Sequence, residues 1–101
     1  MEQDIFDVRG LHIVITGGAS GIGLAAAREL AGRGALLDIW DNKPASLAAA
    51  LEGPLQPCSE QITTRQVDVA DADAVEAAAE VAWQAAPVDV LINCAGMTSH
   101  R

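Results

Sequence analysis

The sequence alternates between short apolar segments and amphipathic segments, and this alternation constrains the fold more than any other feature. Four short segments rich in apolar or β-branched residues predict β-strands, at residues 11–15, 35–40, 62–67 and 88–92. Apolar residues recur at helical spacing in residues 22–31, 44–51 and 72–86, and residues 54–61 are expected to form a polar loop. Strands that alternate with helices predict parallel strands and right-handed crossovers, the arrangement of a doubly wound α/β sheet.

Length and composition limit this fold to one small domain. The chain has 101 residues, of which 50% are hydrophobic, so we expect residues 1–101 to form a single domain with one modest core. The 14 acidic residues outnumber the 6 Lys and Arg residues, and no basic cluster is present that could bind nucleic acid. No segment has the roughly 18 consecutive apolar residues of a membrane span, and the N-terminus lacks the pattern of a signal peptide. We therefore expect a cytoplasmic protein that binds neither nucleic acid nor membranes.

The two cysteines, Cys58 and Cys94, have neither the spacing of a zinc site nor the context of a disulfide framework. We expect both thiols to be buried as small apolar groups, which is the usual environment of a free cysteine. The sequence therefore predicts no metal site.

A glycine-rich stretch, TGGASGIG at residues 16–23, lies between the first expected strand and the first expected helix. In a doubly wound sheet, ligands bind beyond the carboxyl ends of the strands, which is where this stretch lies. Glycines allow backbone N–H groups to approach a phosphate closely, and the N-terminus of a helix attracts an anion. The stretch therefore indicates a phosphate site, and a tight turn without a ligand is the alternative. Its spacing matches neither G-x-G-x-x-G nor a P-loop.

Polar residues follow the other three expected strands. Asp41 follows the second strand, 18 residues after Gly23, close to the offset of about 20 residues at which a carboxylate binds the adenosine ribose of a dinucleotide. Asp68 and Val69 follow the third strand, and residues 93–96 follow the fourth. Taken singly, the two aspartates could cap the next helices, and the last segment could simply turn the chain. Four such strand ends at one edge of a sheet favour a dinucleotide site.

Together these motifs resemble the N-terminal part of the short-chain dehydrogenase/reductase family, over about residues 11–96. The family pattern T-G-x-x-x-G-x-G is matched by Thr16, Gly17, Gly21 and Gly23, its strand-end acidic residue by Asp41, its Asp-Val pair by Asp68 and Val69, and its N-N-A-G motif by Asn93, Ala95 and Gly96. The resemblance implies a Rossmann-like sheet with strand order 3-2-1-4 and a site for NAD(P). It implies pyrophosphate contacts at residues 17–23, with direct contacts from Ser20 and Ile22, a ribose contact at Asp41, adenine contacts at Asp68 and Val69, and contacts on the nicotinamide side at residues 93–96.

Three residues bear on how closely the chain follows the family. Cys94 stands where the family usually has a second asparagine. Asp38 lies in a strand that should be buried on both faces, where an unpaired carboxylate is costly, so we expect it to face a partly open side. Lys43 could approach the 2′-phosphate of NADP, but Asp41 would repel that phosphate, and the sequence favours NAD over NADP.

The resemblance also identifies residues that this chain lacks. The family's chemistry depends on a serine and a Tyr-x-x-x-Lys pair further along the chain, whereas this sequence has no tyrosine and its only lysine is Lys43. We therefore predict no catalytic residues here and expect a truncated cofactor-binding segment of an oxidoreductase that acts on an alcohol or carbonyl substrate. The alternative is a non-catalytic dinucleotide-binding or structural module that needs a partner to complete its sheet.

The fourth expected strand, residues 88–92, is almost continuously apolar, which is typical of a central parallel strand. In the order 3-2-1-4 it would instead lie at an edge, with unpaired backbone groups and apolar side chains in contact with water. We therefore expect the chain to be marginally stable in isolation or to self-associate through this strand.

Overall fold

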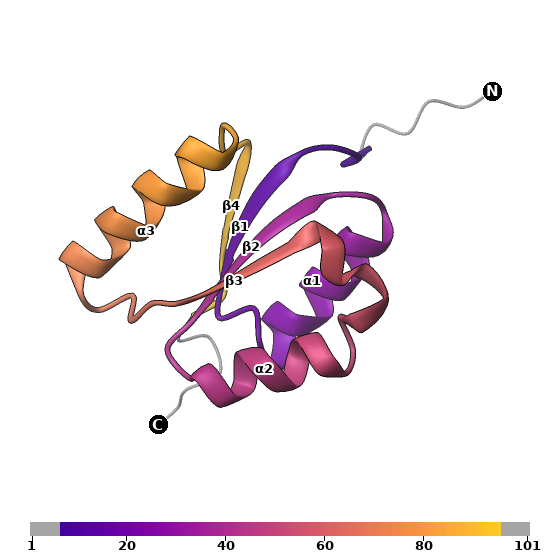
Figure 1. Ribbon diagram of the computed structural model, residues 1–101, viewed down its shortest axis with the longest axis horizontal. Coiled ribbons are helices and arrows are strands. Elements are labelled where there is room, and N and C mark those ends of the chain that lie inside the picture. The colour runs from indigo at the N-terminus through magenta and orange to yellow at the C-terminus, as the bar shows by residue number, and fades with distance from the viewer. Residues whose placement is uncertain (1–6, 96–101) are drawn as a thin grey trace.

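A four-stranded parallel sheet with helices on both faces forms the structure, a computed structural model that describes residues 7–95 (Figure 1). The strands are β1 (His12–Thr16), β2 (Leu36–Asp41), β3 (Ile62–Gln66) and β4 (Val90–Asn93). The helices are α1 (Gly21–Gly32), α2 (Pro44–Glu52), the short 3₁₀ helix η1 (Gln56–Gln61) and α3 (Ala72–Ala85). The spatial order is β3-β2-β1-β4 and every pairing is parallel, so the predicted fold class and strand order are confirmed.

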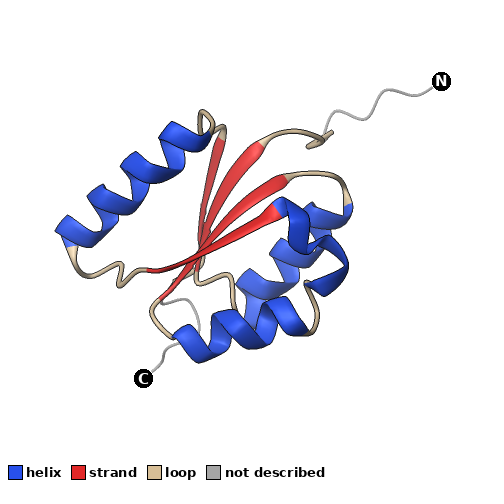
Figure 2. Cartoon of the chain, viewed as in Figure 1, coloured by secondary structure: helices blue, strands red, loops and turns tan. Residues whose placement is uncertain are grey.

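The strand side chains alternate between two cores, one on each face of the sheet. Figure 2 shows α1 and α2 together on one side of the strands and α3 on the other. The core beneath α1 and α2 includes Ile13, Ile15, Ala27, Ala31, Leu37, Ile39, Leu47 and Ala50. The core beneath α3 is smaller and consists of the buried residues Val14, Trp40, Val67, Ala78 and Ala82. The α3 face of the sheet is therefore less completely covered than the opposite face.

Each strand begins and ends within two residues of its predicted bounds, and three of the four extend one residue further at the carboxyl end. Thr16, Asp41 and Asn93 lie within β1, β2 and β4, although each was expected to follow its strand. The backbone ladder extends this far because Gly17 N–H donates to Trp40 O at 2.7 Å and Cys94 N–H donates to Thr16 O at 3.0 Å. The strand ends that carry the polar residues are therefore hydrogen-bonded to one another.

The expectation of a polar loop at residues 54–61 is wrong in part, because η1 occupies most of this segment. The tight turn forms around Leu55, which is only 1% exposed and accepts a hydrogen bond from Cys58 N–H at 3.0 Å. Burial of the Leu55 side chain holds the segment against the core below α1 and α2.

The expectation that both cysteines are buried is also wrong, since Cys58 and Cys94 are each half-buried.

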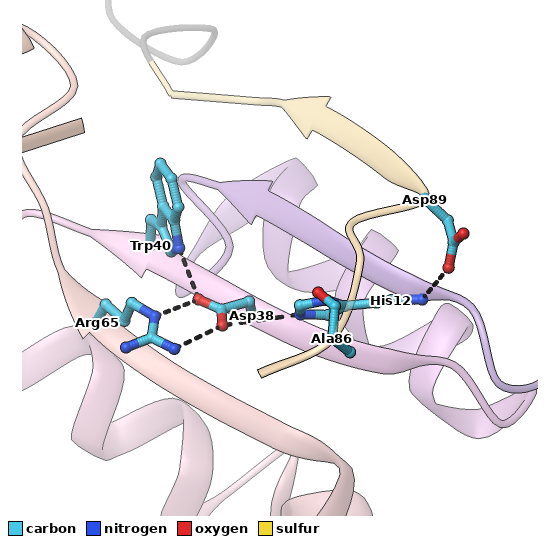
Figure 3. A network of polar contacts seen from close by, with 6 residues as sticks. All are labelled: His12, Asp38, Trp40, Arg65, Ala86 and Asp89. Carbon is cyan, nitrogen blue, oxygen red and sulfur yellow. Dashed lines mark hydrogen bonds and ion pairs between the residues drawn. The ribbon is translucent and has the colours of Figure 1, made fainter. Parts of the chain in front are cut away.

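Asp38 corrects a third expectation, because it does not face an open side. It is 2% exposed on the α3 face, where its carboxylate accepts two hydrogen bonds from Arg65 and one from the indole of Trp40 (Figure 3). His12, buried on β1, lies beside this group with its Nε2 atom 3.9 Å from Asp38 Oδ2. The carboxylate is therefore paired within the sheet by a residue of the neighbouring strand.

The outer edge of β4 carries exposed apolar side chains, as expected for this strand order. Leu91 is 64% exposed, and on the adjacent α3 Trp83 is 58% and Val81 48% exposed. By contrast β3, at the other edge of the sheet, has the mixed sequence ITTRQ, of polar and apolar residues.

Within residues 7–95, no helix is long and apolar enough to cross a membrane. No group of three or more potential metal-ligating side chains occurs in the same described range.

Candidate functional site

A cleft of about 220 Å³ opens where the strands end, between the glycine-rich loop, the end of β2 and the start of the segment before α3. Eight residues singled out from the sequence line it: Gly17, Ser20, Ile22, Gly23, Asp41, Asp68, Val69 and Ala95. Gly21 begins α1 beside the cleft, Asn93 lines a neighbouring groove, and Gly96 lies outside the described residues. The cleft is also lined by Trp40, Asn42, Lys43, Val67 and Cys94.

Glycines at two positions allow the loop, the helix and the end of β4 to meet. Gly17 has a φ angle of +70°, and a Cβ atom there would lie 2.9 Å from the backbone N and Cα of Ala95. A Cβ atom on Gly23 would lie 2.0 Å from the carbonyl oxygen of Gly17. Neither contact is possible for a residue with a side chain, so both positions require glycine for packing, and Gly17 also requires it for its backbone conformation.

The N-terminus of α1 lies at the cleft. Ser20 is the N-cap residue, with extended backbone and no hydrogen bond from its side chain to the helix. The first N–H groups of a helix have no partner within the helix and carry partial positive charge. Because Ser20, Ile22 and Gly23 line the cleft, this end of α1 can hold an anionic group such as a phosphate there.

Thr16 ties the end of β4 to the glycine-rich loop. Its hydroxyl donates to Asn93 Oδ1 at 2.5 Å and accepts hydrogen bonds from the backbone N–H groups of Cys94 and Ala95, at 3.1 and 3.3 Å. Asn93 therefore does more than turn the chain, since its amide joins β4 to β1. Sequence reasoning recognised Thr16 only as part of a motif. The signal in the sequence was a hydroxyl residue directly after an expected strand, whereas its backbone donors, Cys94 and Ala95, lie 78 and 79 residues away.

The two acidic residues of the cleft do not cap helices. Asp41 is half-buried, and its Oδ1 atom accepts a hydrogen bond from Lys43 N–H at 3.1 Å, within the turn before α2. Asp68 Oδ1 accepts one from Ala70 N–H at 2.9 Å, whereas the N-cap of α3 is Asp71. The capping alternative is therefore wrong for both residues. Their carboxylates are held by turns at the mouth of the cleft.

This arrangement defines a class of protein. A parallel sheet of order 3-2-1-4 with a glycine-rich turn before α1 and an acidic residue at the end of β2 is the Rossmann-like arrangement found in dinucleotide-binding domains. The family model described as short chain dehydrogenase matches residues 11–101. The chain belongs to the short-chain dehydrogenase/reductase family.

Individual relatives span a range of oxidoreductases and are much longer than this chain. Galactitol 2-dehydrogenase (L-tagatose-forming) of Cereibacter sphaeroides is 40% identical over 96 residues, a match that covers 94% of this chain and 36% of the relative. L-sorbose reductase of Gluconobacter frateurii, solved with NADPH and L-sorbose, superposes with a TM-score of 0.81 at 31% identity, over 95% of this chain and 38% of the reductase. A short-chain dehydrogenase/reductase of Burkholderia phymatum, solved with NAD, gives a TM-score of 0.77 at 30% identity, over 86% of this chain and 31% of that protein.

Proposed function

We propose that this chain binds NAD and is the cofactor-binding part of an oxidoreductase that interconverts an alcohol and a carbonyl compound. The pyrophosphate would lie on residues 17–23 at the N-terminus of α1, with direct contacts from Ser20 and Ile22. Asp41 would accept hydrogen bonds from the adenosine ribose, and Asp68 and Val69 would flank the adenine. Residues 93–96 would lie on the nicotinamide side.

The close packing around Gly17 and Gly23 is the observation that carries this proposal. These glycines bring the end of α1 and the backbone after β4 together at one cleft, so that a single extended ligand can contact both. The polar groups also fit the cofactor, because they combine N–H donors at a helix N-terminus for phosphates with a carboxylate acceptor for ribose hydroxyls. Nicotinamide supplies hydride transfer when bound, and the residues of this chain hold and orient it.

The cofactor preference in this proposal is NAD rather than NADP. Asp41 and Lys43 both line the cleft, and they favour opposite cofactors, because a carboxylate repels the 2′-phosphate and an ammonium attracts it. Asp41 is half-buried and Lys43 is exposed, so the carboxylate is less screened by solvent and should dominate. The solved relatives include complexes with NAD and with NADPH, so both cofactors occur in the family.

An alcohol or carbonyl substrate is proposed from the relatives, which include a galactitol dehydrogenase and a sorbose reductase. This chain has no tyrosine and a single lysine, so we place the proton-transferring residues of the reaction outside its 101 residues. A single-domain organisation and a cytoplasmic location remain predictions from the sequence.

Isothermal titration with NAD and NADP tests the cofactor assignment. We expect NAD to bind more tightly, and we expect Asp41→Asn to weaken NAD binding by roughly 10- to 100-fold, because it removes the charge and one of the two acceptor oxygens that face the ribose hydroxyls. The matched control is Asp73→Asn, which removes an exposed carboxylate in the first turn of α3. Equal affinity of the Asp41 and Asp73 variants for NAD would contradict the ribose role of Asp41.

The exposed outer edge of β4 favours a second candidate, a non-catalytic dinucleotide-binding module that completes its sheet with a partner. A turnover assay on the sample used for titration tests where the proton-transferring residues lie. Binding of NAD without hydride transfer is expected of both when the chain is alone. Hydride transfer by the isolated chain would overturn our assignment of the proton-transferring residues to a region outside it.

A further inference from the structure

Trp40 lies between two hollows of the molecule. It lines the cleft at the strand ends, and it also lines an apolar groove of about 360 Å³ on the α3 face. The residue is 4% exposed and packs in the core with Val14 and Val67, and Val67 lines the cleft as well. Because Trp40 lines the cleft and directly precedes Asp41, it forms part of the wall on the side we assign to adenosine.

Asp38 holds that indole in place. Trp40 Nε1–H donates to Asp38 Oδ1 at 2.6 Å, and the same carboxylate accepts bonds from Arg65 Nε at 2.7 Å and Arg65 Nη2 at 3.0 Å (Figure 3). Asp38 and Trp40 are two residues apart on β2 and face the same side, while Arg65 is the register partner of Trp40 on β3. The two hydrogen bonds from the planar guanidinium hold the Asp38 carboxylate in one orientation, in which Oδ1 can accept from the indole.

Stability alone does not account for a charge at this position. A carboxylate that is 2% exposed has lost its hydration, and replacement of a buried ion pair by well-packed apolar residues is often neutral or stabilising. An apolar side chain at residue 38 would fill the space but would offer no acceptor to the indole N–H. The carboxylate therefore orients the Trp40 side chain, since it favours the ring orientation in which Nε1 faces it.

We propose that Asp38 is a positioning residue for the adenosine side of the cleft and that it acts through the indole of Trp40. This inference rests on the proposed function, because it concerns the same cleft. Arg65 orients the Asp38 carboxylate, the carboxylate orients Trp40, and Trp40 sets the wall beside Val67 and Asp41. His12 borders the group on β1, where its Nδ1 atom lies 2.9 Å from Ala86 O.

The test measures the two halves of the cofactor separately, by titration with AMP and with nicotinamide mononucleotide. All variants are made with Trp83→Phe, so that Trp40 is the only tryptophan. Trp83 lines the groove and is 58% exposed. We expect Asp38→Ala to weaken AMP binding by about fivefold, the effect of one lost hydrogen bond, and to leave nicotinamide mononucleotide binding unchanged. The emission anisotropy of Trp40 without ligand should also fall, because the ring is no longer held.

Two further variants separate positioning from folding. Asp38→Asn keeps an acceptor oxygen for the indole and should retain AMP affinity within about twofold. Trp40→Phe keeps an aromatic ring without the N–H and should weaken AMP binding as Asp38→Ala does. The double variant should show no additional loss, since both changes remove the same bond. If Asp38→Ala leaves Arg65 unpaired and does not fold, by circular dichroism, Asp38→Asn and Trp40→Phe still provide the comparison.

The outcomes distinguish this inference from the function on which it rests. If the Trp83→Phe chain binds neither AMP nor NAD, the proposed function fails and the inference fails with it. If that chain binds AMP but Trp40→Phe binds it equally well, only the inference is overturned. Equal losses for AMP and nicotinamide mononucleotide would also overturn it, because they would indicate a general effect on the fold.

Discussion

At the scale of single residues, the glycines decide whether the cleft can form. The sequence pattern indicated that backbone approaches a phosphate at residues 17–23. The structure adds that Gly23 is also required for packing, since a Cβ atom there would lie 2.0 Å from Gly17 O. Gly32, the last residue of the same helix, differs in this respect, because a Cβ atom there would meet nothing within 4 Å. Replacement by alanine should therefore disturb the packing at Gly23 but not at Gly32.

We expect Gly23→Ala to lower the free energy of unfolding by about 1 to 3 kcal/mol, the usual cost of overpacking, and to abolish measurable NAD binding. The control, Gly32→Ala, should leave binding unchanged and should raise stability by up to about 1 kcal/mol, because alanine favours the helix. Urea denaturation and calorimetric titration measure the two effects. Similar losses in both variants would show that the contact between α1 and the loop is not the cause.

At the scale of secondary structure elements, α3 has a different kind of N-terminus from α1. The Asp71 side chain accepts hydrogen bonds from the N–H groups of Asp73 and Ala74, at 3.1 and 3.2 Å, so the first turn of α3 is capped. Ser20, at the start of α1, makes no such bond from its side chain. The Asp71 cap stabilises α3, whereas the N–H groups at the start of α1 have no side-chain cap and remain available at the cleft.

We therefore expect Asp71→Ala to lower the free energy of unfolding by about 1 kcal/mol without weakening NAD binding. Asp73→Ala removes an acidic residue from the same turn without removing an acceptor of the cap, and it should cost less. Chemical denaturation of the two variants, together with titration of NAD, gives the comparison. An equal cost for the two substitutions would indicate an effect of charge rather than of capping.

At the scale of the whole molecule, β4 is an edge strand of the described sheet, with exposed apolar side chains and outer backbone groups that pair with no further strand. Leu91 is 64% exposed beside Trp83, and the outer backbone groups of an edge strand can pair with another chain. The chain covers 36% of the length of galactitol 2-dehydrogenase, so that relative has more polypeptide than the four strands seen here.

We predict that the isolated chain self-associates through this edge and that Leu91→Lys shifts it toward the monomer, because lysine at an edge disfavours pairing. Leu36→Lys is the control, since Leu36 is also exposed, at 41%, but lies on β2 in the interior of the sheet. Sedimentation velocity at several concentrations measures the change. A monomer with a sharp, reversible two-state transition before any substitution would contradict the prediction.

Much of the fold and of the cleft could be predicted because their signals are local. Short segments rich in apolar or β-branched residues identified all four strands, and the glycine-rich stretch located the turn before α1. The strand order came from the resemblance to the family, and eight of the proposed cofactor-binding residues line one cleft. The errors fell where a residue's environment depends on a distant partner, as at Asp38 and at Leu55, whose burial holds η1 in place.

By itself, the sequence determined the alternation of strands and helices, the position of the glycine-rich turn and the acidic residue at the end of β2, because backbone conformation and periodicity are properties of neighbouring residues. Only the tertiary structure decided that Asp38 pairs with Arg65, 27 residues away, and that its carboxylate also holds Trp40. The physical reason is that a charge inside a sheet is stabilised or not by whichever side chain the adjacent strand places beside it, and strand register is set by the whole fold.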